Sequence, residues 1–406
     1  MDGLELWKRN LWAMWSAQAA GMMAINFVIT FIPLYVQSEL GIRDLKAVSF
    51  WSGILVGSAA LFAAFSGPVW GNLADRRGRK VMVVRVLLSS FIIVSSMSLA
   101  RDVYQFLALR SLQGAFGGLF AAGIALVASI APPEKIGYVL GVFQTAGIAG
   151  AVLGPMIGGI LADTVGYRLT FITMGLVSLL AAGVVTLFVR EEFVPAPVRA
   201  GQGVWRGIRE AVNSERLLAM IVALFLVQFG TMVISPILPL FIKDLSHTQA
   251  RVASTSGIVV AMGGLASAVS AVLAGKLSER VPSTRILIFS ATIGGVLYLL
   301  QGAAQSVPQL MFLRVASGLF IGGMVPTANA IIGRIVPPEK RGVMYGVATS
   351  ASLMGNVLGP LAGGAIAALI NMRGVFALTA ALHLGAAFWV YKQVAGPERR
   401  ANPASR

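Results

Sequence analysis

The chain of 406 residues contains no cysteine and only two histidines. The lack of cysteine excludes disulfide bonds, thiolate metal sites and a cysteine nucleophile. Charged residues are also scarce, at 12% of the sequence against about 25% in soluble domains, whereas apolar residues make up 57%. A water-soluble fold of this composition would lack the polar groups needed to cover its surface. Composition therefore predicts a membrane protein surrounded by a lipid bilayer.

Acidic residues are half as frequent as basic ones, with 16 Asp and Glu against 32 Lys and Arg. A basic surplus is typical of nucleic-acid-binding proteins, but the positions of the charges exclude a nucleic-acid partner here. Most basic residues fall on one side of the expected spans, as in the stretch 76–80 and in the tail at Arg399 and Arg400. This asymmetry is the positive-inside signal, so we expect both termini in the cytoplasm and the chain in the cell (inner) membrane.

Long apolar runs fill most of the chain. Since a helix needs about 20 mostly apolar residues to cross a bilayer, the sequence predicts twelve spans, at residues 11–36, 48–70, 81–100, 104–131, 138–162, 169–189, 217–242, 252–274, 286–305, 309–335, 343–370 and 374–391. The first run is too long for a cleaved signal peptide, although Ala17-Gln18-Ala19 looks like a cleavage site. We therefore expect an all-α membrane protein with an N-terminal six-helix bundle over 1–189, a cytoplasmic linker over 190–216 and a C-terminal six-helix bundle over 217–406.

The two halves of the sequence repeat one pattern. Pro132-Pro133-Glu134-Lys135 and Gly154-Pro155 recur as Pro337-Pro338-Glu339-Lys340 and Gly359-Pro360, displaced by about half of the 406 residues. A fixed displacement of this length in so apolar a chain is typical of two-fold pseudosymmetric membrane transporters.

The stretch Gly71-Asn-Leu-Ala-Asp75-Arg76-Arg77-Gly78-Arg79-Lys80 follows the second span. Its glycines allow a tight turn, and Asp75 beside Arg76 and Arg79 near a helix N-terminus can clamp two helix ends until a movement breaks the clamp. Ordinary positive-inside anchoring is the alternative. The stretch matches the pattern Gly-x-Leu-Ala-Asp-Arg-x-Gly-Arg-Lys and so resembles the signature between the second and third helices of the major facilitator superfamily. Its copy at 275–284 in the second half is degenerate.

In the fourth span, Arg110 and Gln113 belong to a sequence that resembles the superfamily motif Arg-x-x-Gln-Gly. A spacing of three places both residues on one helix face. An arginine inside the bilayer costs roughly 3 kcal/mol or more, so we expect it to face a wet cavity or a partner. The alternative is an arginine near the helix end that snorkels or is bonded to carbonyls. The resemblance implies that Arg110 contributes to proton coupling. In the second half, Arg314 has Ser317 in place of the glutamine, which predicts a weaker role.

The fifth span carries small residues on one stripe, together with a proline: Gly147, Gly150, Gly154, Pro155 and Gly158. Such a stripe permits close contact between helix backbones, and a proline within a helix should bend it. The arrangement Gly-Pro-x-x-Gly-Gly resembles the antiporter motif shared by exporters of the drug:proton antiporter branch. The resemblance favours export over uptake.

Few polar residues lie inside the spans. Four of them occur on the first, fourth, seventh and tenth spans, which line the central cavity in the superfamily that the sequence resembles: Asn26, Gln113, Gln228 and Asn329. With Phe27 and Met232, these helices would form a soft, apolar cavity suited to bulky lipophilic ligands. Helix packing or lipid contact is the alternative for each apolar residue. All acidic residues map to loops or span ends, so we do not expect strong selectivity for cations.

The resemblance implies a secondary transporter that works by alternating access between two bundles. We expect a proton-driven exporter of lipophilic drugs or related amphipathic small molecules, acting as a monomer without a metal or cofactor. An exporter or facilitator of sugars or another endogenous metabolite is the alternative within this fold. The glycine cluster at 114–118 lies inside a span, so we expect it to serve packing; no nucleotide-binding Gly-x-x-x-x-Gly-Lys-Ser/Thr string occurs. With two histidines and no embedded carboxylate pair, an enzyme is not expected.

Overall fold

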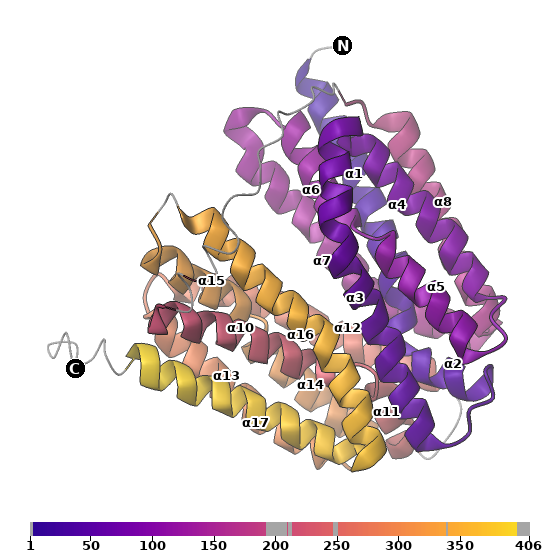
Figure 1. Ribbon diagram of the computed structural model, residues 1–406, viewed down its shortest axis with the longest axis vertical. Helices are drawn as coiled ribbons and strands as arrows, with labels where there is room; N and C mark the ends of the chain where they lie inside the picture. Colours follow the sequence, from indigo (N-terminus) through magenta and orange to yellow (C-terminus); the bar gives the residue numbers. More distant parts are fainter. Residues whose placement is uncertain (1–2, 192–208, 210–212, 247–250, 338–339, 396–406) are drawn as a thin grey trace, which may run out of the picture. The chain divides into compact units, whose positions relative to one another are not determined.

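The computed structural model describes all residues except 1–2, 192–208, 210–212, 247–250, 338–339 and 396–406 (Figure 1). The described ranges consist of helices joined by short connections, with no strand. Eleven of its helical segments are long and apolar enough to cross a membrane, and a bent pair near the N-terminus raises the number to twelve when it is counted as one span. The prediction of an all-α protein with twelve membrane spans is confirmed.

The first half contains these helices: α1 (Gly3–Asn26), η1 (Phe27–Thr30), α2 (Ile32–Ser38), α3 (Leu45–Arg77), α4 (Arg79–Met97), α5 (Val103–Ala115), α6 (Leu119–Ile130), η2 (Pro133–Lys135), α7 (Ile136–Val165) and α8 (Tyr167–Phe188). The second half contains α10 (Glu215–Val233), α11 (Leu238–Ser246), α12 (Val252–Leu277), α13 (Ser283–Gly302), α14 (Val307–Ile321), α15 (Met324–Ile335), α16 (Arg341–Leu369), α17 (Met372–Val390) and η4 (Tyr391–Ala395). Most of the expected linker lies outside the described residues.

Four of the predicted spans are interrupted, and they are the first, fourth, seventh and tenth. The first bends by 54° between Leu6–Thr30 and Ile32–Ser38. The fourth changes direction between α5 and α6, where Gly118 has a left-handed backbone with φ 100°. The other two breaks separate α10 from α11 and α14 from α15. Hydropathy did not reveal these breaks, because each span stays apolar across them.

The chain divides into two compact units. The first consists of Met1–Asp44, Ile54–Arg199 and Thr248–Ala261; the second consists of Leu45–Gly53, Ala200–His247 and Met262–Arg406. The beginning of α12 therefore belongs to the first unit and the beginning of α3 to the second. Each unit has its own apolar core, built around Leu11, Leu87 and Phe143 in the first and around Met220 and Ile332 in the second.

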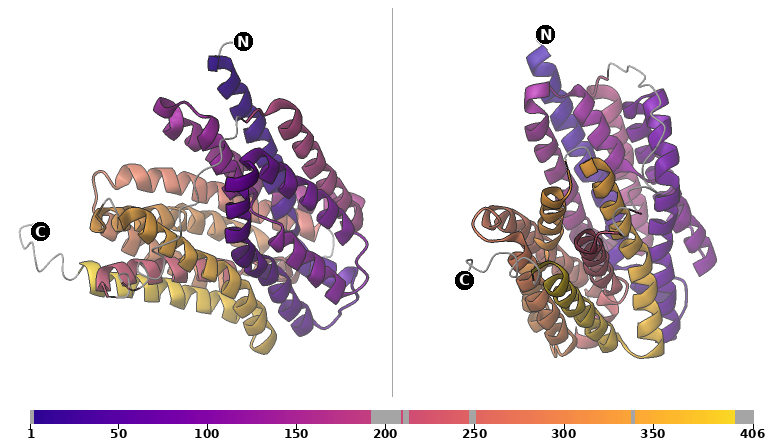
Figure 2. Two further views of the ribbon diagram at one scale, coloured as in Figure 1. Left: turned by 45° about the horizontal axis from the view of Figure 1, so that its top comes forward. Right: turned by 60° about the vertical axis from the view of Figure 1, so that its left-hand side comes forward.

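Both units use the same helix pairing (Figures 1 and 2). In the first unit α1 packs against α7 and α4 packs against α8. In the second unit α10 packs against α16 and α13 packs against α17. These helices occupy corresponding places in the two halves, so the sequence repeat is a repeat of packing as well.

Candidate functional site: the motif helices of the first unit and their counterparts

The connection between α3 and α4 is shorter than the sequence predicts. Helix α3 continues through Gly71 to Arg77, and only Gly78, with φ 98°, leaves the helical conformation. The expectation that Gly71 forms part of the turn is therefore wrong, because one glycine in an extended, positive-φ conformation is enough to reverse the chain. The side chain of Asp75 lies outside what the structure describes, so its clamp stays a prediction. Arg76 is exposed.

A carboxylate does hold the start of α4, and it belongs to Glu191. Its two oxygens accept hydrogen bonds from Arg79 N at 3.0 Å and Lys80 N at 2.8 Å. An anion at this place satisfies backbone N–H groups that have no partner within the helix and interacts favourably with the helix dipole. The Arg79 side chain is half-buried, and its Nε has no hydrogen-bond partner among the described residues. Sequence reasoning missed Glu191 because it follows the sixth span at the start of a charged stretch.

The end of α8 is held by α1 as well. The Asn10 side chain donates to Arg190 O at 3.0 Å and accepts from Arg190 N at 3.1 Å. Lys80 Nζ donates to Thr186 O at 2.9 Å. Together with the Glu191 cap, these bonds join the ends of α1, α4 and α8 within the first unit.

Arg110 and Gln113 lie together in α5, as their spacing predicts. Arg110 is only 3% exposed, and its Nη1 donates to Gln113 Oε1. Its Nε donates to Leu55 O in α3 at 3.2 Å. Gln113 is 8% exposed, and its Nε2 is buried with no hydrogen-bond partner. Among the described residues, Arg110 has no carboxylate within ion-pair distance, so this buried cation is held by neutral oxygens alone.

The glycine cluster after Gln113 both packs and breaks the span. A Cβ on Gly114 would come under 3.0 Å from the backbone of Ala59, so α5 and α3 touch at this point. Gly118 then supplies the left-handed residue at the start of α6. The expectation that the cluster serves packing alone is corrected: Gly114 packs, whereas Gly118 redirects the chain.

The carbonyl groups released by this break are bonded by α3 and α4. Trp70 Nε1 donates to Ala115 O at 2.6 Å, and Arg85 Nη2 donates to Gly117 O at 3.1 Å. The Arg85 guanidinium also lies 3.5 Å from the centroid of the Trp70 ring, in a cation–π contact. Backbone groups away from water need such partners, since an unpaired one is costly in an apolar medium. The sequence gives no local signal for this arrangement, because its members come from three helices.

Three glycines of α7 lie against the first span, formed here by α1 and η1. A Cβ on Gly154 would lie 2.8 Å from Met23 O, and one on Gly158 would lie 2.7 Å from Phe27 Cβ. Gly150 meets α1 in the same way, with neighbours under 3.0 Å. The expected close contact between backbones is therefore present, and its partners are α1 for Gly150 and Gly154 and η1 for Gly158.

The remaining residues of the motif have other neighbours. A Cβ on Gly147 would lie 2.9 Å from the Phe120 ring of α6. Pro155 lies within α7, which runs as one helix from Ile136 to Val165. The Pro155 carbonyl lies against Gly257 of α12, so this part of the motif faces a different helix.

The last turn of α7 is also bonded to α12 within the first unit. Asp163 Oδ2 accepts from Ser254 N at 2.7 Å, and Ser254 Oγ donates to Gly159 O at 3.4 Å. These contacts continue the α7–α12 packing to the end of the helix.

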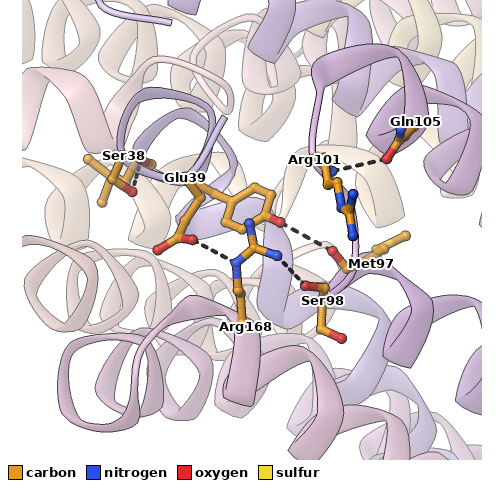
Figure 3. A network of polar contacts seen from close by, with 9 residues as sticks. Ser38, Glu39, Met97, Ser98, Arg101, Gln105 and Arg168 are labelled. Carbon is orange, nitrogen blue, oxygen red and sulfur yellow. Dashed lines mark hydrogen bonds and ion pairs between the residues drawn. The ribbon is translucent and has the colours of Figure 1, made fainter. Parts of the chain in front are cut away.

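The same end of the first unit carries an ion pair (Figure 3). Arg168, at the start of α8, lies between the chain after α2 and the end of α4. Its Nε donates to Glu39 Oε2 at 2.8 Å, and its Nη1 donates to Ser98 O at 2.7 Å. Tyr35 Oη donates to Met97 O at 3.2 Å. These bonds join three helix ends across the bundle.

Two of the residues expected in the cavity lie at the break in the first span. The Asn26 amide donates to Met22 O at 2.8 Å in its own helix. Phe27 is fully buried, and its ring contacts those of Phe31 and Phe171. Both residues stay predictions as ligand contacts.

The other expected cavity residues lie in the second unit. Gln228 Nε2 donates to Asn356 Oδ1 at 2.6 Å, so two in-span polar residues of α10 and α16 pair. Met232 is half-buried, and a Cβ on Gly359 would lie 2.7 Å from its Cβ. Asn329 is half-buried, and its carbonyl accepts from Tyr345 Oη at 3.3 Å. Their roles in a cavity stay predictions.

Two buried glutamines escaped the sequence reasoning. Gln18 in α1 is 1% exposed, and neither amide atom has a hydrogen-bond partner among the described residues; it lies in the run first noted for its likeness to a cleavage site. Gln301 in α13 donates to Ser317 Oγ at 3.1 Å and accepts from Arg314 Nη1 at 3.5 Å. Arg314 thus has a glutamine partner after all, supplied by another helix. No group of three His, Asp or Glu residues that could hold a metal occurs in the described ranges.

Known proteins resemble this chain in sequence and in fold. The family model described as Major Facilitator Superfamily matches residues 14–298 and 220–406. The chain is 35% identical over 374 residues to "Multidrug resistance protein MdtG" of Enterobacter lignolyticus (strain SCF1), with 92% of this chain and 89% of that protein covered. It is 35% identical over 389 residues to the protein of that name from Yersinia enterocolitica serotype O:8 / biotype 1B, with 95% and 93% covered. A solved bacterial homologue of the human lysosomal transporter Spinster, inward-facing and occupied, matches with a TM-score of 0.76 at 15% identity, covering 95% of this chain and 96% of that one.

Proposed function

Because the chain belongs to the Major Facilitator Superfamily, we propose that it is a secondary active exporter of lipophilic drugs or related amphipathic molecules, driven by proton antiport. Relatives that match nearly the whole chain at 35% identity are named multidrug resistance proteins. Their names support drugs as substrates over the alternative of sugars or other endogenous metabolites.

The contact between α7 and the interrupted first span carries the proposal. Gly150, Gly154 and Gly158 bring the two backbones together without interlocking side chains. Small residues of this kind let two membrane helices approach closely. The bent first span lies directly on it, and discontinuous helices are typical of transporter binding sites. The antiporter-like sequence thus coincides with the surface on which α7 packs against the bent first span.

We extend the proposal to the individual residues by analogy with the superfamily. We assign substrate contacts to residues on the interrupted spans: Asn26, Phe27, Gln113, Gln228, Met232 and Asn329. We assign proton coupling and gating to Arg110 and to the α3–α4 connection with Asp75, Arg76 and Arg79. The protein acts as a monomer in the cell (inner) membrane, with both termini in the cytoplasm, an orientation supported by the excess of basic residues at the termini and in the connections on their side of the membrane. Residues 1–189 and 217–406 form the two moving bundles, joined by the linker 190–216.

The test is accumulation of a fluorescent lipophilic drug in bacteria that lack their own efflux pumps. Cells expressing the chain should accumulate several-fold less drug than cells carrying an empty vector, and a protonophore should abolish the difference. Equal accumulation in both cell lines would contradict drug export. Efflux that continues unchanged after the proton gradient collapses would contradict proton antiport.

A further inference from the structure

The membrane spans contain buried positive charge without negative charge. Every acidic residue in the described chain lies in a connection or in the first or last turn of a helix. Arg110, by contrast, lies inside the span formed by α5 and α6, and only 3% of this residue is exposed. A charge in such a position needs a partner or a polar cavity, and no described side chain supplies a carboxylate.

The partners of Arg110 leave several donors unused. A guanidinium carries five N–H donors and no acceptor. Here Nε reaches Leu55 O and Nη1 reaches Gln113 Oε1, both of them neutral. The Nε2 group of Gln113 adds donors that are buried and have no partner. The pair therefore offers donors only, and what would satisfy it is a ligand rich in acceptor oxygens.

We propose that Arg110 and Gln113 bind the anionic group, such as a carboxylate, sulfonate or phosphonate, of an amphipathic substrate, and that the transporter prefers amphipathic anions to lipophilic cations. The planar guanidinium fork binds such groups through two parallel hydrogen bonds, and the adjacent glutamine amide adds a third donor. The inference rests on the proposed export function and specifies its substrate class.

The second unit supplies a matched control. Arg314 Nη1 contacts Gln301 Oε1 at 3.5 Å, but the Gln301 amide already donates to Ser317 Oγ at 3.1 Å and to Leu313 O at 3.5 Å. The glutamine beside Arg314 therefore has its donors satisfied within the protein, whereas the one beside Arg110 does not. Of the two arginine–glutamine pairs, only that of Arg110 therefore has a buried amide donor left for a ligand oxygen.

The experiment uses the full-length protein in proteoliposomes with an imposed pH gradient. Two radiolabelled naphthalene derivatives, one a sulfonate and the other a trimethylammonium, share the apolar body and keep their charge at every pH, so the gradient does not redistribute them passively. The lipophilic drug of the cell assay serves as a reference substrate. We expect a KM for the sulfonate about tenfold or more below that for the ammonium compound, the size of a charge-assisted hydrogen bond.

Variants then localise the effect. Arg110→Lys keeps the charge but loses the fork and should raise the KM for the sulfonate about tenfold, with little change in the KM for the ammonium compound. Gln113→Leu should raise the same KM less, and Arg314→Lys should leave the ratio of the two KM values unchanged. A role of Arg110 in proton coupling alone would lower kcat for all substrates equally and leave that ratio unchanged, which would overturn the inference.

The outcomes separate the two proposals. Transport of the drug and the ammonium compound without the sulfonate would overturn the anion site and leave export standing. If none of the three compounds moves, the export function itself fails, and the anion site fails with it. If Arg110→Lys does not yield folded protein by size-exclusion chromatography, the wild-type KM ratio and Gln113→Leu decide the question.

Discussion

Glu191 shows how one side chain can organise the end of a bundle. Its carboxylate caps α4, while the neighbouring Arg190 backbone is bonded to Asn10 in α1. The cap lies at the α3–α4 motif, where the sequence assigned the acidic role to Asp75. The role of Asp75 as a clamp stays a prediction, and the observed cap comes from Glu191, a residue outside the motif and distant from α4 in the sequence.

Replacing Glu191 with alanine should destabilise the protein by about 1 kcal/mol, because two backbone N–H groups at the start of α4 lose their acceptor. The measurement is thermal unfolding of the purified protein in detergent, and the variant should melt at a lower temperature. Glu134→Ala is the control, since Glu134 is exposed and should leave the melting temperature unchanged. An equal effect of both substitutions would show that the cap contributes nothing specific.

The partner of Arg314 could not be predicted from the residues near it in the sequence. Ser317 stands where the first half has a glutamine, so sequence reasoning expected no glutamine partner. Gln301 of α13 supplies one in the folded protein. A partner on another helix leaves no mark at a fixed spacing, so only the packing of α13 on α14 reveals it.

Among the helices, the twelve spans were predictable and their interruptions were not. The number of spans follows from the hydropathy and length of the apolar segments, and both can be taken directly from the sequence. An interruption depends on one left-handed residue and on distant donors, as Gly118, Trp70 and Arg85 show. The partner of the α7 stripe was likewise hidden, although the stripe itself was visible as regularly spaced glycines. The contact of this stripe with α1 could be identified only from the folded structure.

The α1–α7 contact leads to a prediction about close packing. Gly154→Ala would place a methyl group 2.8 Å from Met23 O, a backbone atom that can move only if α1 moves. Overpacking of this kind costs about 1–3 kcal/mol, so we expect a lower melting temperature and slower drug efflux. Gly141→Ala in the same helix is the control, because nothing lies within 4 Å of its added methyl group. Normal efflux by Gly154→Ala would contradict a role for this contact in movement.

The break in the fourth span can be tested at Gly118. An alanine there would be forced into a left-handed conformation at φ 100°, which costs about 1–2 kcal/mol. Gly118→Ala should therefore unfold at a lower temperature than wild type, although nothing lies within 4 Å of the added methyl group. Gly137→Ala, in an equally open but helical place, should not. Equal melting temperatures for the two variants would contradict the strain at the break.

For the molecule as a whole, the repeat extends from sequence to packing but not to chemistry. The pairing of α1 with α7 and of α4 with α8 recurs as α10 with α16 and α13 with α17. The polar groups differ between the units: one arginine is paired within its helix and the other across two helices. The two units therefore share their helix pairing but not the polar contacts of these arginines.

The most direct test of proton-coupled drug export is simultaneous recording of drug uptake and lumenal pH in everted membrane vesicles. With an acidified lumen, adding the drug should cause its accumulation inside together with a rise in lumenal pH, as protons leave in exchange. Vesicles without the protein should show neither signal. Drug accumulation with an unchanged lumenal pH, in vesicles that respond normally to a protonophore, would contradict proton antiport.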